Sequence, residues 1–324
     1  MKPRALVTRL LPPAVMDRLR RETALALEPA DRVLTPAELI AAIAPCDALL
    51  PSVTETIDAA VIGAAPQLRV IANFGVGFNH IDVAAATARR IFVTNTPGVL
   101  TETTADIAFG LLIAAGRRFS EGERLARSGQ WAGWGPLQLL GHDIAGATLG
   151  LVGFGRIGRA MARRARGFGM RVIYCGRSRL PADVERDLGV EHRERDALLD
   201  ESDFVSLHVA YTPETHHLID QGALARMKPT AVLVNTSRGA VVDESALVQA
   251  LRQGTIAAAG LDVFEREPRM EPGLAGLPNC VLLPHLGSAT IGTRTRMGMM
   301  AVDNLLAACR GERPPNCVNA VVPG

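Results

Sequence analysis

Short apolar, β-branched runs alternate with longer Ala- and Leu-rich stretches along most of the chain, which predicts a parallel α/β fold. The first part of the chain ends near the Pro97-Gly98 turn, and a long helix is predicted over 101–118. The strands predicted before that turn are 5–8, 48–50 and 69–73, and the helices are 12–22, 36–43 and 57–64.

The same alternation continues through the rest of the chain, from about residue 147 onward. It predicts a second parallel sheet flanked by helices. The predicted strands are 147–152, 171–174, 204–208, 231–235, 257–261 and 281–283, and the predicted helices are 157–167, 214–218, 244–252 and 289–308.

Between two of these strands the sequence LGLVGFGRIGRAMA places Gly153, Gly155 and Gly158 at G-x-G-x-x-G spacing. The first glycine permits a sharp turn, the second lets backbone N–H groups approach a pyrophosphate, and the third lets the helix pack close to the sheet. The helix N-terminus then favours the negative charge. With 31 glycines in 324 residues the spacing alone is weak, and a tight turn without a ligand is the alternative. The strand–helix–strand context favours a dinucleotide site.

The end of the second strand bears on which dinucleotide binds. NAD-binding folds usually carry Asp or Glu there to bind the ribose 2′-OH, but this chain reads Tyr-Cys-Gly-Arg-Ser-Arg over 174–179. Arg177 and Arg179 can pair with a 2′-phosphate, and Ser178 can donate a hydrogen bond to it. We therefore predict NADP(H) over NAD(H), the alternative being that these residues form only a solvated loop.

Composition agrees with a two-domain enzyme. The chain has 324 residues, of which 48% are hydrophobic, and this exceeds the usual size of a single core. The formal charge of +2 argues against nucleic acid as a partner, and no apolar stretch predicts a membrane segment. The five scattered cysteines suggest neither a disulfide framework nor a metal site, so no metal and a cytoplasmic location are expected.

Three charged residues each follow a predicted strand, where ligands bind in open α/β sheets. Arg238 lies in VNTSRGAVVDE, Glu267 in GLDVFEREP and His285 in VLLPHLGSA. An arginine binds a carboxylate bidentately, a histidine transfers protons near neutral pH, and an adjacent carboxylate fixes the histidine tautomer. Each residue alone would more simply be a surface or loop residue. Together, in a chain with a dinucleotide loop, they predict reduction of a 2-oxo acid.

With these motifs, and with NFGVGFNHIDV and NTPGVLTETTADIAFGLLIAAGRR, nearly the whole chain resembles the D-isomer-specific 2-hydroxyacid dehydrogenases, and among them the glyoxylate/hydroxypyruvate reductases. The resemblance implies two Rossmann-like, doubly wound parallel-sheet domains. We expect a discontinuous, flavodoxin-like outer domain for substrate over 1–99 and 287–324, and an NAD(P)-binding domain over 100–286. Asn79 stands where family members often carry Asp, which bears on loop geometry and not on the chemistry.

The resemblance also implies roles for individual residues. Arg238, Glu267 and His285 are the expected catalytic residues, and Arg238 and His285 bind substrate with the backbone N–H groups of Val76 and Gly77. The expected cofactor-binding residues are Thr104, Gly153, Phe154, Gly155, Arg156, Ile157, Gly158, Arg177, Ser178, Arg179, His208, Val209, Pro213, Thr236, Ser237, Asp262 and Gly287.

The expected activity is NADPH-dependent reduction of glyoxylate or hydroxypyruvate to a D-2-hydroxy acid. In similar reductases a segment like residues 130–140, which hold Trp131 and Trp134, reaches a partner subunit, which implies a homodimer; an intrachain anchor is the alternative. Two other functions stay open. One is a dehydrogenase for 2-ketogluconate, phosphoglycerate or another D-2-hydroxy acid, and the other is a dinucleotide-sensing corepressor.

Overall fold

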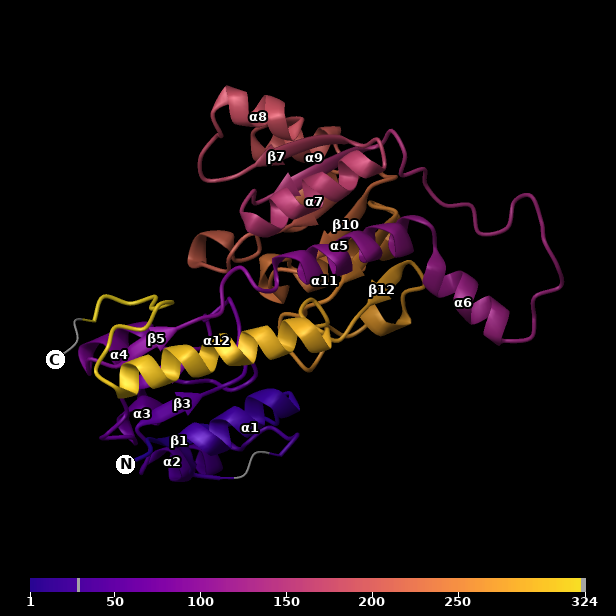
Figure 1. Ribbon diagram of the computed structural model, residues 1–324. Coiled ribbons are helices and arrows are strands. Elements are labelled where there is room, and N and C mark those ends of the chain that lie inside the picture. Colours follow the sequence, from indigo (N-terminus) through magenta and orange to yellow (C-terminus); the bar gives the residue numbers. More distant parts are fainter. Residues whose placement is uncertain (28–29, 322–324) are drawn as a thin grey trace. The chain divides into compact units, whose positions relative to one another are not determined.

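The computed structural model describes residues 1–27 and 30–321 and divides into two compact units. Unit 1 comprises Met1–Leu100 and Ala289–Gly324, and unit 2 comprises Thr101–Ser288. Residues 28–29 and 322–324 of the expected outer domain lie outside the described part. Each unit is built around its own parallel sheet (Figure 1), which confirms the predicted α/β class with two Rossmann-like domains and a discontinuous outer one.

Unit 1 contains a five-stranded parallel sheet in the order β2-β1-β3-β4-β5. Side chains alternate between its faces, so that Ala5 and Val7 pack with α1 and α12 and Leu6 packs with α2 and α3. The elements are β1 (Arg4–Val7), α1 (Pro13–Glu22), β2 (Ala24–Leu25), α2 (Pro36–Ile43), β3 (Ala48–Leu50), α3 (Ala59–Gly63), β4 (Val70–Ala72), α4 (Val83–Ala88), β5 (Phe92–Thr94) and α12 (Ile291–Cys309).

Unit 2 contains a seven-stranded parallel sheet in the order β12-β11-β10-β9-β6-β7-β8. Helices α5 and α7 cover one face, and α9, α10 and α11 cover the other. Its main elements are α5 (Thr101–Gly116), α6 (Phe119–Arg127), β6 (Thr148–Val152), α7 (Arg156–Gly167), β7 (Arg171–Cys175), α8 (Ala182–Leu188), β8 (Val190–His192), α9 (Arg195–Glu201), β9 (Phe204–Leu207), α10 (Gln221–Arg226), β10 (Val232–Asn235), α11 (Glu244–Gln253), β11 (Ala258–Leu261) and β12 (Cys280–Leu282).

One predicted helix was wrong in type, and another was wrong in extent. The helix predicted over 214–218 is only a 3-10 turn, Pro213–Thr215, because His217 has a left-handed backbone (φ 48°) and donates its N–H to the carbonyl of Ala240. The long helix predicted to reach residue 118 ends at Gly116, and Arg118, with φ 57°, separates it from α6. A left-handed residue cannot continue a right-handed helix.

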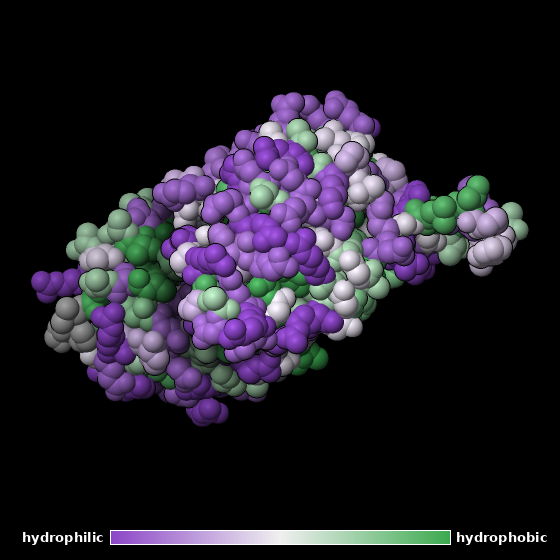
Figure 2. Space-filling view, turned by 90° about the horizontal axis from the view of Figure 1, so that it is seen from above, coloured by the Kyte–Doolittle hydropathy of each residue, from purple (hydrophilic) through white to green (hydrophobic). Residues whose placement is uncertain are grey.

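Helix α6 and the loop that follows it stand away from the rest of unit 2 (Figure 1). We call this segment, residues 119–140, the arm. Its large apolar side chains are exposed, which gives the hydrophobic surface visible on the same extension in Figure 2. These residues are Phe119, Trp131, Trp134, Leu137 and Leu140.

Candidate active site

The glycine-rich loop joins β6 to α7 at the carboxyl edge of the sheet in unit 2, where the strand order reverses between β6 and β9. Gly153 has φ 93°, and a β-carbon there would lie 2.7 Å from the carbonyl group of His208. A β-carbon at Gly158 would overlap the carbonyl oxygen of Gly153. Both positions therefore require glycine for the turn and for close packing.

Gly155 differs from these two glycines, because a β-carbon there would meet no atom within 4 Å. It is the N-cap of the 12-residue helix α7, and no side chain caps this helix, so the N–H groups of its first turn are left for another acceptor. Phe154, Arg156 and Ile157 lie in the same turn. This cradle of free amides at a helix N-terminus fits the pyrophosphate of a dinucleotide.

Arg177, Ser178 and Arg179 follow β7, as expected for the ribose end of a dinucleotide site. Arg179 donates from Nε and Nη2 to the two oxygens of Glu185, both at 2.9 Å. Glu185 also accepts the hydroxyl of buried Tyr174 at 2.8 Å. The hydrogen bonds from Arg179 and Tyr174 hold the pKa of Glu185 below its ordinary value. The sequence analysis missed Glu185, since it lies on the next helix.

The loops after β9 and β10 reach the same edge. His208 lies beyond β9 with its Nε2 3.0 Å from the hydroxyl of Ser206, and burial lowers the pKa of His208 to about 3, so its ring is neutral. Val209 follows it, and Pro213 begins the 3-10 turn. After β10, Thr236 and Ser237 are buried, and Ser237 donates its N–H and hydroxyl to Oδ1 of Asn235.

The three predicted catalytic side chains come together in unit 2. Nδ1 of His285 lies 2.9 Å from Oε2 of Glu267, whose other oxygen accepts the N–H of Phe264 at 3.0 Å. Burial opposes ionisation of Glu267, but the hydrogen bond and charge of His285 outweigh it, so the pKa of Glu267 is lowered. Burial lowers the pKa of Arg238, and the charge of Glu267 opposes that change. Glu267 therefore interacts with both His285 and Arg238.

The loop that carries His285 is fixed by Asp262. His285 has a left-handed backbone (φ 56°) and donates its N–H to the carbonyl of Asp262 at 2.9 Å. The Asp262 carboxylate accepts the N–H groups of Leu286 at 2.6 Å and Gly287 at 2.7 Å. Thr104 donates its hydroxyl to the carbonyl of Gly287 at 3.2 Å. These contacts hold an unusual backbone conformation next to a reactive side chain.

In unit 1, Val76 and Gly77 lie in the loop after β4. The carbonyl of Val76 accepts a hydrogen bond from Nδ2 of Asn95 at 2.9 Å, and the carbonyl of Gly77 accepts one from Nδ2 of Asn73 at 3.0 Å. The sequence analysis did not single out either asparagine, although both stand in the motifs that carry the family resemblance.

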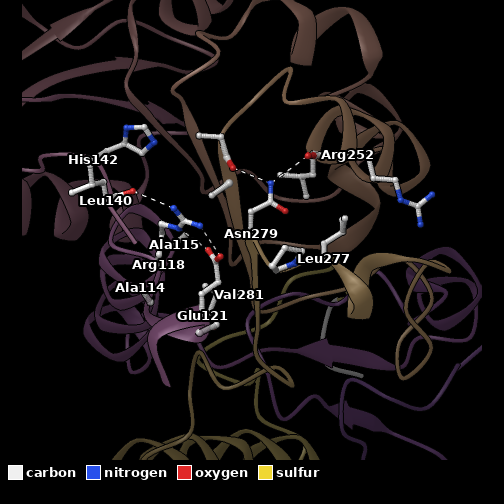
Figure 3. Close-up of a pocket in the computed structure, with 15 residues that line it drawn as sticks. Ala114, Ala115, Arg118, Glu121, Leu140, His142, Arg252, Leu277, Asn279 and Val281 are labelled. Atoms are coloured by element: carbon white, nitrogen blue, oxygen red, sulfur yellow. Dashed lines mark hydrogen bonds and ion pairs between the residues drawn. The ribbon is translucent and has the colours of Figure 1, made fainter. Parts of the chain in front are cut away.

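A separate pocket of about 510 Å³ lies elsewhere in unit 2, near the end of α5 and the amino ends of β11 and β12 (Figure 3). Arg118 at this pocket pairs with Glu121 at 2.8 Å, and Asn279 donates to the carbonyl of Ala257 at 3.0 Å. The predicted catalytic residues lie at the carboxyl edge of the sheet, so this pocket is not the candidate active site.

In the described ranges, 1–27 and 30–321, no group of three or more His, Cys, Asp and Glu side chains has the arrangement of a metal site. None of the helices found there combines the length and apolarity that crossing a membrane requires.

Comparisons with known proteins define the class of this fold and site. The family model described as D-isomer specific 2-hydroxyacid dehydrogenase, NAD binding domain, matches residues 109–287. A glyoxylate reductase of Korarchaeum cryptofilum is 52% identical over 324 residues, which are 99% of this chain and 97% of that protein. A glyoxylate reductase of Thermococcus litoralis is 47% identical over 98% of this chain and 97% of its own.

Solved structures agree with this result. The NADPH-dependent glyoxylate/hydroxypyruvate reductase of Sinorhizobium meliloti, in complex with NADP and malonate, is 37% identical, with a TM-score of 0.86 over 100% of this chain and 98% of that chain. The fold is that of a nicotinamide-dinucleotide oxidoreductase. The chain belongs to the family of D-isomer-specific 2-hydroxyacid dehydrogenases, which confirms the resemblance drawn from its motifs.

Proposed function

We propose that this protein reduces small 2-oxo acids, glyoxylate and hydroxypyruvate, to D-2-hydroxy acids with NADPH. The observation that carries the proposal is the His285–Glu267 pair at 2.9 Å, with Arg238 in electrostatic reach, at the edge of the sheet that also bears the glycine-rich loop. The names of the related reductases support the substrate class.

A bound nicotinamide dinucleotide supplies the hydride in such a reaction. Arg238 binds the substrate carboxylate and polarises the keto group, and the family resemblance assigns the N–H groups of Val76 and Gly77 to substrate binding. A carboxylate only accepts hydrogen bonds, so Nδ1 of His285 carries the proton shared with Glu267, and Nε2 faces the substrate. His285 then donates its Nε2 proton to the developing alkoxide, and Glu267 stabilises the protonated ring before that step.

The preference for NADPH rests on the residues after β7. Residues 177–179 are two arginines and a serine, and none of them is a carboxylate that would repel a 2′-phosphate. Glu185 holds Arg179 side-on through Nε and Nη2, which leaves the end-on N–H pair of the guanidinium for a phosphate. Arg177→Ala is expected to lower kcat/KM with NADPH more than with NADH.

Steady-state rates over a panel of 2-oxo acids with both cofactors test the proposal. We expect turnover of glyoxylate and hydroxypyruvate and a higher kcat/KM with NADPH. A preference for 2-ketogluconate or another larger acid would identify the alternative dehydrogenase. Tight dinucleotide binding without turnover of any 2-oxo acid would contradict the enzyme and favour the sensing role.

We also propose that the protein is a cytoplasmic homodimer assembled through the arm. The exposed fraction of Trp134 is 83% and that of Leu137 is 81%, and apolar area of this kind is stabilised when a partner covers it. All five cysteines are unpaired, which agrees with a reducing compartment. Light scattering is expected to give twice the chain mass, and Trp134→Ser is expected to weaken the association; a monomer at micromolar concentration would contradict it.

A further inference from the structure

In the loop after β4, asparagine side chains donate hydrogen bonds to the carbonyl groups of three consecutive residues, 75 to 77. Nδ2 of Asn73 donates to the carbonyl of Gly75 at 3.1 Å and to that of Gly77 at 3.0 Å. Nδ2 of Asn95 donates to the carbonyl of Val76 at 2.9 Å. The N–H of Thr96 also donates to the carbonyl of Gly75 at 3.0 Å, whereas the carbonyls of Val76 and Gly77 are each held by an asparagine side chain.

In a trans peptide the N–H points opposite to the C=O of the same group. Fixing the carbonyls of residues 75, 76 and 77 therefore turns the N–H groups of Val76, Gly77 and Phe78 away from the asparagine amides that hold these carbonyls. These three amides have no hydrogen-bond partner among residues 1–27 and 30–321. Successive free N–H groups of this kind form a concave site for an anion.

The burial and hydrogen bonds of Asn73 indicate the role of its side-chain amide. The residue is fully buried, and its Oδ1 has no hydrogen-bond partner in the described structure. A buried carbonyl oxygen without a partner is unfavourable. The side chain is therefore explained by its two donated hydrogen bonds to the loop.

We propose that Asn73 and Asn95 are positioning residues, which aim the N–H groups of Val76, Gly77 and Phe78 at the carboxylate of the 2-oxo acid. This inference rests on the proposed function, because that function supplies the carboxylate. The proposal adds the N–H of Phe78 to the two donors expected from the family. It also proposes that the orientation of all three N–H groups is set by side chains that do not touch the substrate.

Asn95 is the residue to vary, because it is only half-buried and makes one side-chain contact with the loop. Asn95→Ala removes the donor, and Asn95→Asp places an acceptor against the carbonyl of Val76. Asn319→Ala is the matched control. Asn319 also holds unit 1 together, through the carbonyl of Ile91 and the N–H of Val93, but it touches no atom of the loop.

The primary measurement is calorimetric binding of oxalate in the presence of NADPH, which does not depend on turnover. We expect the Kd for oxalate and the KM for glyoxylate to rise about 10-fold in Asn95→Ala and further in Asn95→Asp, by analogy with the loss of one hydrogen bond to a charged group. The Kd for NADPH is expected to stay within about 2-fold, and Asn319→Ala is expected to lower only the thermal stability.

Unchanged oxalate affinity in both Asn95 variants would overturn the proposal, as would a wild-type protein that does not bind oxalate. An equal loss in Asn319→Ala would also overturn it, since the effect would then follow from general destabilisation. Failure of the proposed function gives a different result: oxalate binds and Asn95→Ala weakens it, but no 2-oxo acid is reduced.

Discussion

Gly155 and Gly158 lie in the same turn, yet the structure predicts opposite consequences for alanine at the two positions. A methyl group at Gly155 meets no protein atom within 4 Å, whereas one at Gly158 overlaps the carbonyl oxygen of Gly153. If the open space at Gly155 is where the pyrophosphate binds, Gly155→Ala impairs binding without affecting folding. Gly158→Ala impairs folding first.

The expected magnitudes follow from these surroundings. Gly155 has φ −78° and extended backbone, which alanine adopts, so Gly155→Ala should change the free energy of unfolding by less than ~1 kcal/mol, in the stabilising direction. Loss of one amide–phosphate hydrogen bond costs about 1.5–3 kcal/mol, or about 10- to 100-fold in the Kd for NADPH. Overpacking at Gly158 should destabilise the protein by about 1–3 kcal/mol.

Urea unfolding without ligand gives the stabilities, and titration of protein fluorescence with NADPH gives the Kd values. The two variants are each other's control, since both add one methyl group to the same loop. Wild-type affinity in Gly155→Ala would refute the placement of the pyrophosphate. If Gly155→Ala destabilised the protein as much as Gly158→Ala, there would be no open space for a methyl group at position 155.

Three further predictions concern ionisable groups. Glu267→Gln should lower kcat/KM by about 10- to 100-fold, because the neutral amide replaces the charged acceptor that lies 2.9 Å from Nδ1 of His285, and an unchanged kcat/KM would contradict this. The pKa of His208, about 3, lies below that of the unfolded chain, so its stabilising contribution is complete above about pH 6.5 and declines as the pH falls toward 3. His208→Asn removes this titration, so the free energy of unfolding of the variant should rise relative to that of wild type, by up to about 3 kcal/mol at pH 4. Parallel plots of unfolding free energy against pH for the two proteins, measured in urea, would refute the assignment. Glu185→Gln should reduce the ratio of kcat/KM for NADPH over NADH about 5-fold by weakening the hold on Arg179, and a constant ratio would show that this hold is unimportant.

The strands of this fold were predictable because both faces of each sheet are covered. Strand β3 is a continuous apolar run between Asp47 and Pro51, and β6 is mainly apolar and is followed by Gly153; such runs are typical of buried parallel strands. Short helices such as α10, with six residues, were missed because their period is too brief to stand out. The two-residue strand β2 was missed because it is defined by pairing with β1 and not by its own composition.

The site was predictable where chemistry is local in sequence. The glycine spacing and the residues after β10, β11 and β12 could be read directly, since parallel strands bring their carboxyl ends to one edge. Glu185 could not be found in this way, because its contacts with Tyr174 and Arg179 depend on how α8 packs beside β7. Asn73 and Asn95 follow different strands, and only the fold brings them to one loop.

The same edge of unit 2 uses two buried carboxylates to fix the loops of the catalytic pair. Asp262 accepts the two amides that follow His285, and Glu244 accepts the amide of Glu265, two residues before Glu267. Burial raises the pKa of both carboxyl groups, which means that burying their charged forms is unfavourable. The backbone hydrogen bonds that they accept offset part of this desolvation energy. The loops are thereby ordered before substrate arrives, and the 2.9 Å separation within the pair does not have to be gained during the reaction. The geometry of His285 and Glu267 is thus set by Asp262 and Glu244, which hydrogen-bond to neither side chain. The sequence motifs do not show this, because the hydrogen bonds form only in the folded chain.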